Sequence, residues 1–332
     1  MSEKIAVIGS NSFSGASFVR HCLNQGLSVL GASRSPELAA CFLPYKWVPA
    51  ADQGGFHFVQ ADLNHDLDGL MAALEKFSPD YVVNFAAQGM VAQSWDIPEH
   101  WYQTNVVANV KFHDRLRKAR WLKKYVHVST PEVYGSTSGL IDERAPFNPS
   151  TPYAASRAAC DLHLRTFLNQ HKFPVAWTRA ANVYGPGQQL YRIIPRTILS
   201  IKLGQKLQLH GGGHSVRSFI HIADVADATL RIARTAPVGE TYHLSTPENI
   251  SIRSLVETIC RVMGADFDAV VQVTEDRPGK DAAYLLDSRK ARETLGWTDT
   301  NTLEAGVAET IRWVHDHLDE ICRQPLDYIH KP

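Results

Sequence analysis

The sequence predicts an α/β protein with a doubly wound parallel sheet and a smaller, discontinuous second domain. Two observations predict this fold class. Short apolar runs typical of buried strands alternate with stretches of helical period through the first half of the chain, and a glycine-bounded turn joins the first strand to the first helix. Repeated β-α units of this size require a parallel sheet with helices on both faces. Ligands of such a sheet lie beyond the carboxyl ends of its strands.

The expected elements follow in chain order. Strands are predicted at 4–8, 28–32, 57–60, 81–85, 125–129 and 175–179, and helices at 15–24, 67–77, 101–119 and 153–170. After residue 183 the pattern changes: a turn cluster at 184–188 precedes a β-α unit at 218–234 and helices at 255–263 and 303–318. We expect a dinucleotide-binding domain at 1–181, to which 215–246 returns, and a substrate domain at 182–214 and 247–332.

Composition excludes several classes of function. The 332 residues carry 34 Lys+Arg against 34 Asp+Glu, so nothing in the net charge favours nucleic acid or an anionic membrane. No apolar run reaches the roughly 18 residues that span a bilayer. Glu3 stands where a signal peptide is basic. The five cysteines are widely separated and form no C-x-x-C pair, which is typical of reduced thiols. The sequence contains no H-E-x-x-H motif of a zinc site. We expect a cytoplasmic protein without a metal site.

The loop after the first strand predicts a dinucleotide site. Gly9 permits a tight turn, and Gly15 lets the following helix pack closely on the sheet, while the backbone N–H groups between them can hold a pyrophosphate. Position 12, often a third glycine in such loops, is serine. The residues expected to contact the cofactor here are Gly9, Asn11, Ser12, Phe13, Ser14 and Gly15.

The end of the second strand predicts which dinucleotide binds. An NAD site usually places a carboxylate there, but this strand ends in Ser33 and Arg34, with no acid before Glu37. A hydroxyl and a guanidinium suit a 2′-phosphate, so NADP is favoured and NAD stays open. Asp62 and Leu63 after the third strand are expected at the adenine, and Ala86 and Ala87 after the fourth at the nicotinamide.

Two segments carry the expected chemistry. Tyr153 and Arg157 are four residues apart and share one helix face, so the cation can stabilise a phenolate and make Tyr153 a proton acceptor. At the end of the fifth strand, Thr130 can hydrogen-bond the same substrate hydroxyl, and Glu132 adds a carboxylate.

These motifs resemble the extended short-chain dehydrogenase/reductases, specifically the nucleoside-diphosphate-sugar 4,6-dehydratases. Segment 84–94 (NFAAQGMVAQS) is similar to the GDP-mannose 4,6-dehydratase branch, which uses NADP. Segments 182–186 (NVYGP), 217–226 (RSFIHIADVA) and 276–281 (DRPGKD) resemble dTDP-glucose 4,6-dehydratases. The resemblance implies that Gln88, Tyr153 and Arg157 also contact the cofactor. It implies a substrate site formed by Gln88, Ser94, Thr130, Asn182, Arg217 and Arg277.

The resemblance implies a reaction on a nucleoside-diphosphate hexose. Tyr153 takes the proton of the 4-hydroxyl as C4 loses hydride, Glu132 removes the C5 proton, water leaves from C6, and the hydride returns to C6. The chain departs from the family twice: Pro131 replaces the acid of dTDP-glucose dehydratases, and Arg157 replaces the lysine of Y-x-x-x-K.

These departures leave alternatives open. The same fold serves 4-epimerases, uronic acid decarboxylases and 5,6-dehydratases, and a degenerate member could bind sugar nucleotide without turnover. The resemblance also implies a homodimer through helices 101–119 and 153–170. Their apolar residues are Val106, Val107, Val110, Phe112, Ala158, Leu162, Leu164 and Phe167. The other interpretation is that these side chains fill the monomer core.

Overall fold

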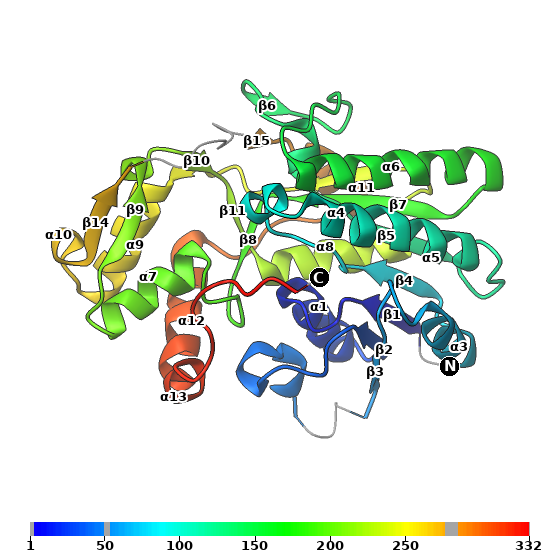
Figure 1. The fold of residues 1–332 in the computed structure, drawn as a ribbon, viewed down its shortest axis with the longest axis horizontal. Coiled ribbons are helices and arrows are strands. Elements are labelled where there is room, and N and C mark those ends of the chain that lie inside the picture. The colour runs from blue at the N-terminus through cyan, green and yellow to red at the C-terminus, as the bar shows by residue number, and fades with distance from the viewer. Residues whose placement is uncertain (1–2, 50–53, 276–284, 332) are drawn as a thin grey trace.

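A seven-stranded parallel sheet forms the centre of the computed structural model, which describes residues 3–49, 54–275 and 285–331 (Figure 1). The strand order is β12-β7-β5-β4-β1-β2-β3, and every neighbouring pair is parallel. The strands are β1 (Lys4–Ile8), β2 (Ser28–Ser33), β3 (Phe56–Gln60), β4 (Tyr81–Asn84), β5 (Lys124–Val128), β7 (Val175–Ala180) and β12 (Thr241–Leu244). The predicted doubly wound fold class is confirmed.

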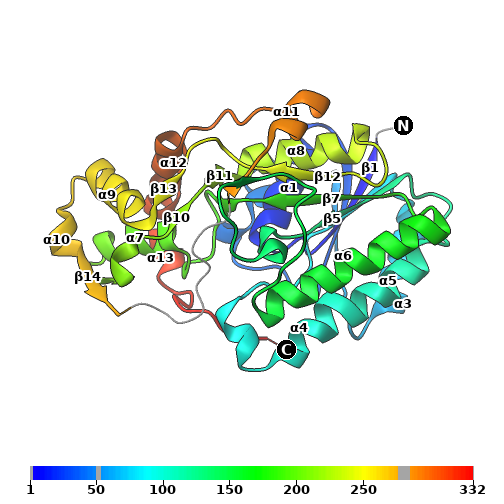
Figure 2. The ribbon, with the colours of Figure 1, turned by 90° about the horizontal axis from the view of Figure 1, so that it is seen from above.

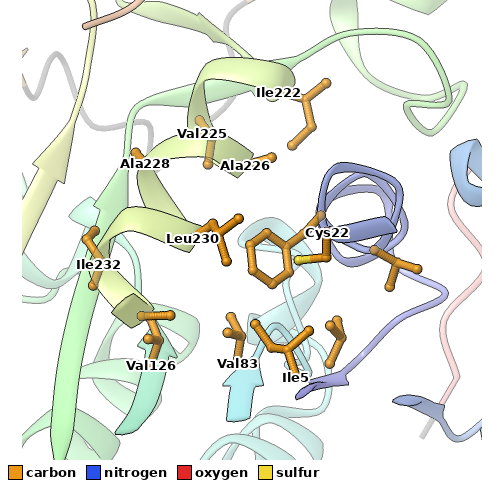
Figure 3. Close-up of a cluster of buried hydrophobic side chains, with 14 of the residues drawn as sticks. Ile5, Cys22, Val83, Val126, Ile222, Val225, Ala226, Ala228, Leu230 and Ile232 are labelled. Atoms are coloured by element: carbon orange, nitrogen blue, oxygen red, sulfur yellow. The ribbon is translucent and has the colours of Figure 1, made fainter. Parts of the chain in front are cut away.

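Helices cover both faces of this sheet because its strands are apolar on both sides. The helices α1 (Phe13–Asn24) and α8 (Ile222–Thr235) pack on one face. Figure 3 shows that core, in which Ile5, Val83 and Val126 of the strands face Cys22 and Leu230 of the two helices. The opposite face is covered by α3 (Leu67–Phe77), α5 (Asn109–Leu116) and α6 (Pro152–His171).

The helix predicted at 101–119 is broken by a π-helical turn. It consists of α4 (Pro98–Tyr102), the π-helix η4 (Gln103–Ala108) and α5, which ends at Leu116. A π-turn inserts one residue into the helical repeat and re-aims its side chains. Here it brings Asn105 and Ala108 into the buried interior, a consequence that period counting did not reveal.

A second body of structure follows β7. Its helices are α7 (Ile193–Lys202), α9 (Ile252–Met263), α10 (Phe267–Val270), α12 (Leu303–Asp316) and α13 (Leu318–Ile321). Small two-stranded sheets pair β8 (Asn182–Tyr184) with β11 (Phe219–His221), β9 (Leu207–His210) with β14 (Val271–Thr274), β10 (Val216–Arg217) with β13 (Ile250–Ser251), and β6 (Leu140–Ile141) with β15 (Leu285–Leu286). Residues 289–295 form α11 (Arg289–Leu295), which packs with Trp297 in the core beside α8. The exact domain division stays a prediction.

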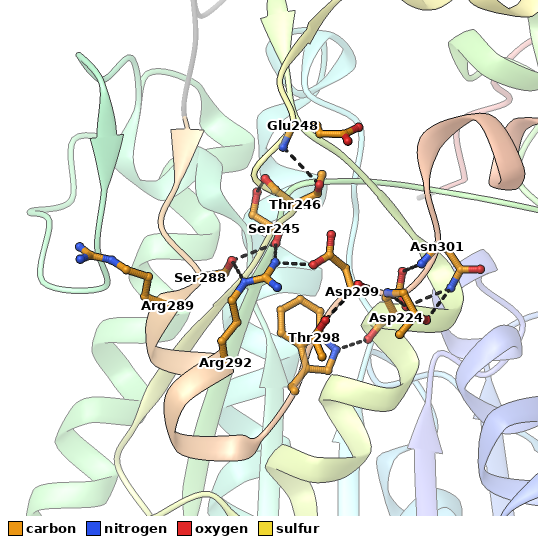
Figure 4. A network of polar contacts seen from close by, with 12 residues as sticks. Asp224, Ser245, Thr246, Glu248, Ser288, Arg289, Arg292, Thr298, Asp299 and Asn301 are labelled. Carbon is orange, nitrogen blue, oxygen red and sulfur yellow. Dashed lines mark hydrogen bonds and ion pairs between the residues drawn. The ribbon is translucent and has the colours of Figure 1, made fainter.

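A polar cluster joins this second body to the sheet (Figure 4). Asp224, near the start of α8 and 4% exposed, accepts hydrogen bonds from the backbone and side chains of Thr300 and Asn301 at 3.0–3.2 Å. Arg292 of α11 donates to Ser245 and pairs with Asp299. These bonds fix the segment that leads into α12.

No helix within the described ranges combines the length and apolarity required to cross a bilayer.

Candidate active site

The loop after β1 has the close approaches that only glycine permits. Gly9 has φ +83°, and a Cβ there would lie 2.7 Å from the backbone nitrogen of Ala86. A Cβ on Gly15 would lie 2.2 Å from the carbonyl oxygen of Gly9. The first turn of α1 is therefore held close to the strand ends, with its N-terminus over the end of β1.

Serine at position 12 acts as the helix cap. Its Oγ accepts from the backbone N–H of Gly15 at 3.1 Å and donates to the carbonyl of Gly9 at 2.7 Å. A capping serine explains why a third glycine is not required here. Asn11 donates from Nδ2 to the carbonyl oxygens of Ser35 and Pro36, so its side chain joins the loop to the segment after β2.

The polar residues at the end of β2 already have internal partners. The hydroxyl of Ser33 accepts from the backbone N–H of Asn11 at 2.9 Å. The carboxylate of Glu37 is bound by Tyr45 at 2.9 Å and by Lys46 at 3.2 Å. Arg34 donates from Nη2 to the carbonyl oxygen of Lys331 at 3.2 Å. A guanidinium, rather than a carboxylate, therefore lies at this strand end.

The remaining predicted cofactor residues lie at neighbouring strand ends. Asp62, after β3, accepts from the backbone N–H of Asn64, and Leu63 is buried. Ala86, after β4, donates its N–H to Asn84, and Ala87 is exposed. Phe13 is buried and Ser14 half-buried in the first turn of α1. All of them therefore lie at the carboxyl edge of the sheet, where the topology places a ligand.

Three predicted catalytic residues come together between β5 and α6. Thr130 caps the short 3-10 turn η5 (Pro131–Tyr134) and accepts the N–H of Glu132 at 3.2 Å. The hydroxyl of Tyr153, in the first turn of α6, is hydrogen-bonded to the side chain of Thr130. Glu132 lies close enough for its negative charge to raise the pKa of Tyr153. Pro131 is the first residue of η5, a position at which no backbone N–H is needed.

The pKa of Tyr153 differs in direction from the sequence expectation. Burial raises it above the ordinary value, while the charge of Arg157 and the hydrogen bond from Thr130 both act to lower it. The expected stabilisation of the phenolate by the cation is present, but desolvation outweighs it.

Arg157 lies one turn further along α6 and is buried, with 2% exposure. Its Nη2 donates to the carbonyl of Val128 and to Nε2 of His127. Its Nε and Nη1 have no hydrogen-bond partner among the described residues. A buried, unpaired donor beside Tyr153 suits a hydroxyl oxygen of a ribose, so this site fits a nicotinamide dinucleotide.

The structure adds two residues that sequence reasoning missed. Asn105, turned inward by the π-helix, accepts the backbone N–H of Gln88 at 2.8 Å and donates to the hydroxyl of Ser156 at 3.0 Å. It thereby joins the loop after β4 to the helix that carries Tyr153. Arg192, just before α7, lies close enough to Tyr153 for its charge to lower that pKa. Asn105 could have been found from the sequence, because it is a polar residue within an otherwise apolar helix face.

The predicted substrate residues lie on several separate elements. Gln88 is buried and donates from Nε2 to the carbonyl of Lys331. Ser94 is buried, and its hydroxyl donates to Val91. Asn182 of β8 donates to Ser218, while Arg217 ends β10. Arg277 lies outside the described residues.

No group of three or more His, Cys, Asp or Glu side chains in the described part of the chain is arranged to hold a metal ion.

A glycine-bounded loop under a helix N-terminus, with a Thr–Glu–Tyr–Arg group between β5 and α6, defines an extended short-chain dehydrogenase/reductase. Residues 7–310 match the family model described as GDP-mannose 4,6 dehydratase. The chain belongs to this family of sugar-nucleotide dehydratases.

Known relatives agree with this assignment. The dTDP-glucose 4,6-dehydratase of Streptomyces niveus is 33% identical over 322 residues, which cover 95% of this chain and 93% of the relative. That of Neisseria meningitidis serogroup B is 30% identical, with 95% and 94% covered. The crystal structure of DesIV, the dTDP-glucose 4,6-dehydratase of Streptomyces venezuelae with NAD and TYD bound, superposes with a TM-score of 0.85 at 29% identity and covers 96% of this chain and 98% of its own. The predicted enzyme class, a dinucleotide-dependent sugar-nucleotide dehydratase, is confirmed.

Proposed function

We propose that this enzyme converts a nucleoside-diphosphate hexose to its 4-keto-6-deoxy derivative. The supporting observation is that the Tyr153 hydroxyl is hydrogen-bonded to Thr130 with the charge of Glu132 nearby. An acceptor for a hydroxyl proton and a carboxylate for a carbon acid are thus close together. Oxidation at C4 followed by elimination across C5 and C6 requires both.

Each residue has a defined task in this reaction. When bound, the dinucleotide would supply the hydride acceptor for C4 and the hydride donor for C6. Tyr153 removes the proton of the 4-hydroxyl, which Thr130 orients by hydrogen bonding. The 4-ketone acidifies the hydrogen on C5, and Glu132 removes it. Arg157 would donate to a ribose hydroxyl of the bound cofactor from one of its unpaired nitrogens.

Glu132 also protonates the leaving hydroxyl in this proposal. Pro131 has neither an acidic proton nor a backbone N–H, so it cannot serve as the acid. A single carboxylate that takes the C5 proton is left protonated, and it can pass that proton to O6 as water leaves. Hydride return to C6 then leaves an enolate, whose C5 takes a proton from solvent while Tyr153 releases the proton that it took from the 4-hydroxyl.

We propose NADP as the preferred cofactor, with NAD as the alternative. Arg34 lies at the end of β2, and the nearest following acid, Glu37, is bound to Tyr45 and Lys46 rather than directed at a ribose. A guanidinium favours a 2′-phosphate. Dissociation constants for NADP⁺ and NAD⁺ test this preference, and Arg34→Ser should remove it. An equal affinity of the parent enzyme for both would contradict it.

We propose that α4, η4 and α6 form a homodimer interface. Val107 and Leu162 are 40% and 57% exposed, and Trp95 just before α4 is 62% exposed. Phe112, Ala158 and Leu164 are instead buried within the monomer, so for them the core interpretation was correct. Exposed apolar side chains gathered on neighbouring helices are typical of association surfaces.

We also propose a cytoplasmic location. All five cysteines of the chain are free thiols, and Cys322 is exposed. An exposed thiol stays reduced in the cytoplasm. Alkylation under denaturing conditions at the moment of cell lysis, with the adducts counted by mass spectrometry, should modify all five cysteines.

The decisive experiment is an activity panel of nucleoside-diphosphate hexoses in deuterium oxide. It begins with dTDP-glucose, because relatives near 30% identity are named for it. The expected product has lost one water and carries one deuterium at C5. A product of unchanged mass would indicate an epimerase, and loss of carbon dioxide from a uronic acid substrate would indicate a decarboxylase. Loss of water with a C5–C6 double bond would indicate a 5,6-dehydratase. Binding without any turnover would support the degenerate binding protein.

A further inference from the structure

The last described residues form a strap across the edge of the sheet. We define this C-terminal strap as residues 326–331, which run from the second body back toward α4 (Figures 1 and 2). At its start, Arg196 of α7 donates to the carbonyl of Leu326 at 3.2 Å and pairs with Asp327 at 2.6 Å. The strap is therefore tied to the second body before it crosses to the nucleotide side.

Aromatic contacts hold its far end. The ring of His330 stacks on Trp101 and on His100, each at 5.1 Å between ring centroids, and shares a 2.8 Å hydrogen bond with His100. Tyr328 hydrogen-bonds to His330 at 3.1 Å and meets Tyr191 edge-on at 5.6 Å. This anchor lies on α4 and on the loop that carries Arg192.

The strap ends between two residues of the proposed cofactor site. The carbonyl oxygen of Lys331 accepts from Arg34 Nη2 at 3.2 Å and from Gln88 Nε2 at 2.5 Å. Arg34 follows β2 and Gln88 follows β4, and these strands are the two neighbours of β1. The peptide at Lys331 therefore spans the space over the end of β1, onto which the glycine loop opens.

We propose that the C-terminal strap occupies part of the dinucleotide cleft and must leave when the cofactor binds. The inference rests on the proposed function only in taking a nicotinamide dinucleotide as the ligand. One carbonyl cannot keep both Arg34 and Gln88 while a dinucleotide fills the space between them. The apparent dissociation constant is the intrinsic one divided by the fraction of molecules with an open cleft.

The test is a chain that ends at Asp327. It keeps the packing of Leu326 and the pair with Arg196, so it should fold as the parent does. If the strap is closed in about nine of ten molecules, its removal lowers the dissociation constants of NADP⁺ and NAD⁺ by the same factor, ~10-fold. Calorimetric titration measures both. His330→Ala should act in the same direction, while Ile329→Ala, at an exposed position (61%), is the matched control and should change nothing.

The outcomes separate the two proposals. Weaker dinucleotide binding after truncation would overturn the strap proposal and make residues 328–331 part of the cofactor site. Equal binding by the two chains would overturn it as well. Binding of neither dinucleotide to either chain would mean that the proposed function had failed. Amide hydrogen exchange across 328–331 of the full chain provides a second readout, and it should accelerate when NADP⁺ is added. Unchanged or slower exchange on saturation with NADP⁺ would contradict displacement.

Discussion

Arg157 donates from Nη2 to Nε2 of His127 at 3.3 Å. Because a guanidinium only donates, His127 accepts at Nε2 and carries its proton on Nδ1, which faces the Tyr125 hydroxyl at 3.2 Å. Burial, reinforced by the charges of Arg157 and Arg179, lowers the pKa of His127 well below its ordinary value. A neutral imidazole thus orients the cation that replaces the family lysine.

His127→Phe should lower kcat about 10-fold in the parent enzyme, since loss of this acceptor lets the guanidinium leave the ribose side. In an Arg157→Lys background the same change should cost less than about 2-fold, because the shorter ammonium does not use the same acceptor. Steady-state kcat and KM of the four variants measure the coupling between the two positions.

His113→Phe is the matched control for that cycle. His113 is also a buried imidazole bonded to Tyr125, at 2.9 Å, but no described contact joins it to Arg157. It should lower stability without coupling to Arg157→Lys in kcat. Equal effects of His127→Phe in both backgrounds would show that His127 is only structural.

Glu132→Gln should separate oxidation from elimination. The amide cannot accept the C5 proton, so we expect dehydration to fall by about 10²–10⁴-fold while hydride removal at C4 persists. Accumulated reduced cofactor, followed at 340 nm on mixing, measures the first step, and deuterium uptake at C5 the second. Glu99→Gln, at an exposed position on α4, is the control. Normal deuterium uptake in Glu132→Gln would assign proton removal to another group.

The pH profile should report on Tyr153. Because burial raises its pKa, the phenolate fraction and with it kcat/KM should still increase with pH in the alkaline range. Thr130→Val removes a hydrogen bond that lowers this pKa, so the alkaline rise should move to higher pH. A rise displaced to lower pH would contradict the assigned direction.

Asp224→Ala should destabilise the fold by about 3 kcal/mol. The change leaves the N–H groups of Thr300 and Asn301 without their acceptor at a buried position. Urea unfolding measures the loss. Asp227→Ala, on the exposed side of the same helix, should cost under about 1 kcal/mol, and equal losses would assign no special role to the Asp224 cluster.

Leu162→Glu tests the dimer. A charged side chain buried at the centre of an apolar interface lowers the association constant of the dimer many-fold. On a surface that makes no contact between subunits, the same charge leaves the association constant unchanged. Sedimentation equilibrium should shift from dimer to monomer. Leu203→Glu, at a partly exposed leucine after α7, should leave the association state unchanged. A parent enzyme that sediments as a monomer would end the proposal.

Local patterns in the sequence were sufficient to predict the central sheet and most of the residues at the carboxyl ends of its strands. The glycine loop depends on near-neighbour sterics: a Cβ on Gly15 collides with Gly9, six residues earlier. Tyr153 and Arg157 share a helix face because of their four-residue spacing. Six of the seven parallel strands and the helix of Tyr153 lie close to where the sequence predicts them, because apolar period is a property of short windows. The strand β12 was not predicted, and the helix expected at 101–119 is interrupted by the π-helix η4.

What the chain sequence determined on its own was which chemical groups are present and at which strand ends they stand. Tertiary structure decided how they are used. His127, which accepts a hydrogen bond from Arg157, is 30 residues away from it in the sequence. Lys331, whose carbonyl accepts a hydrogen bond from Arg34, is 297 residues away from Arg34 in the sequence. Such contacts depend on packing that no local pattern encodes, and so does the burial that raises the pKa of Tyr153.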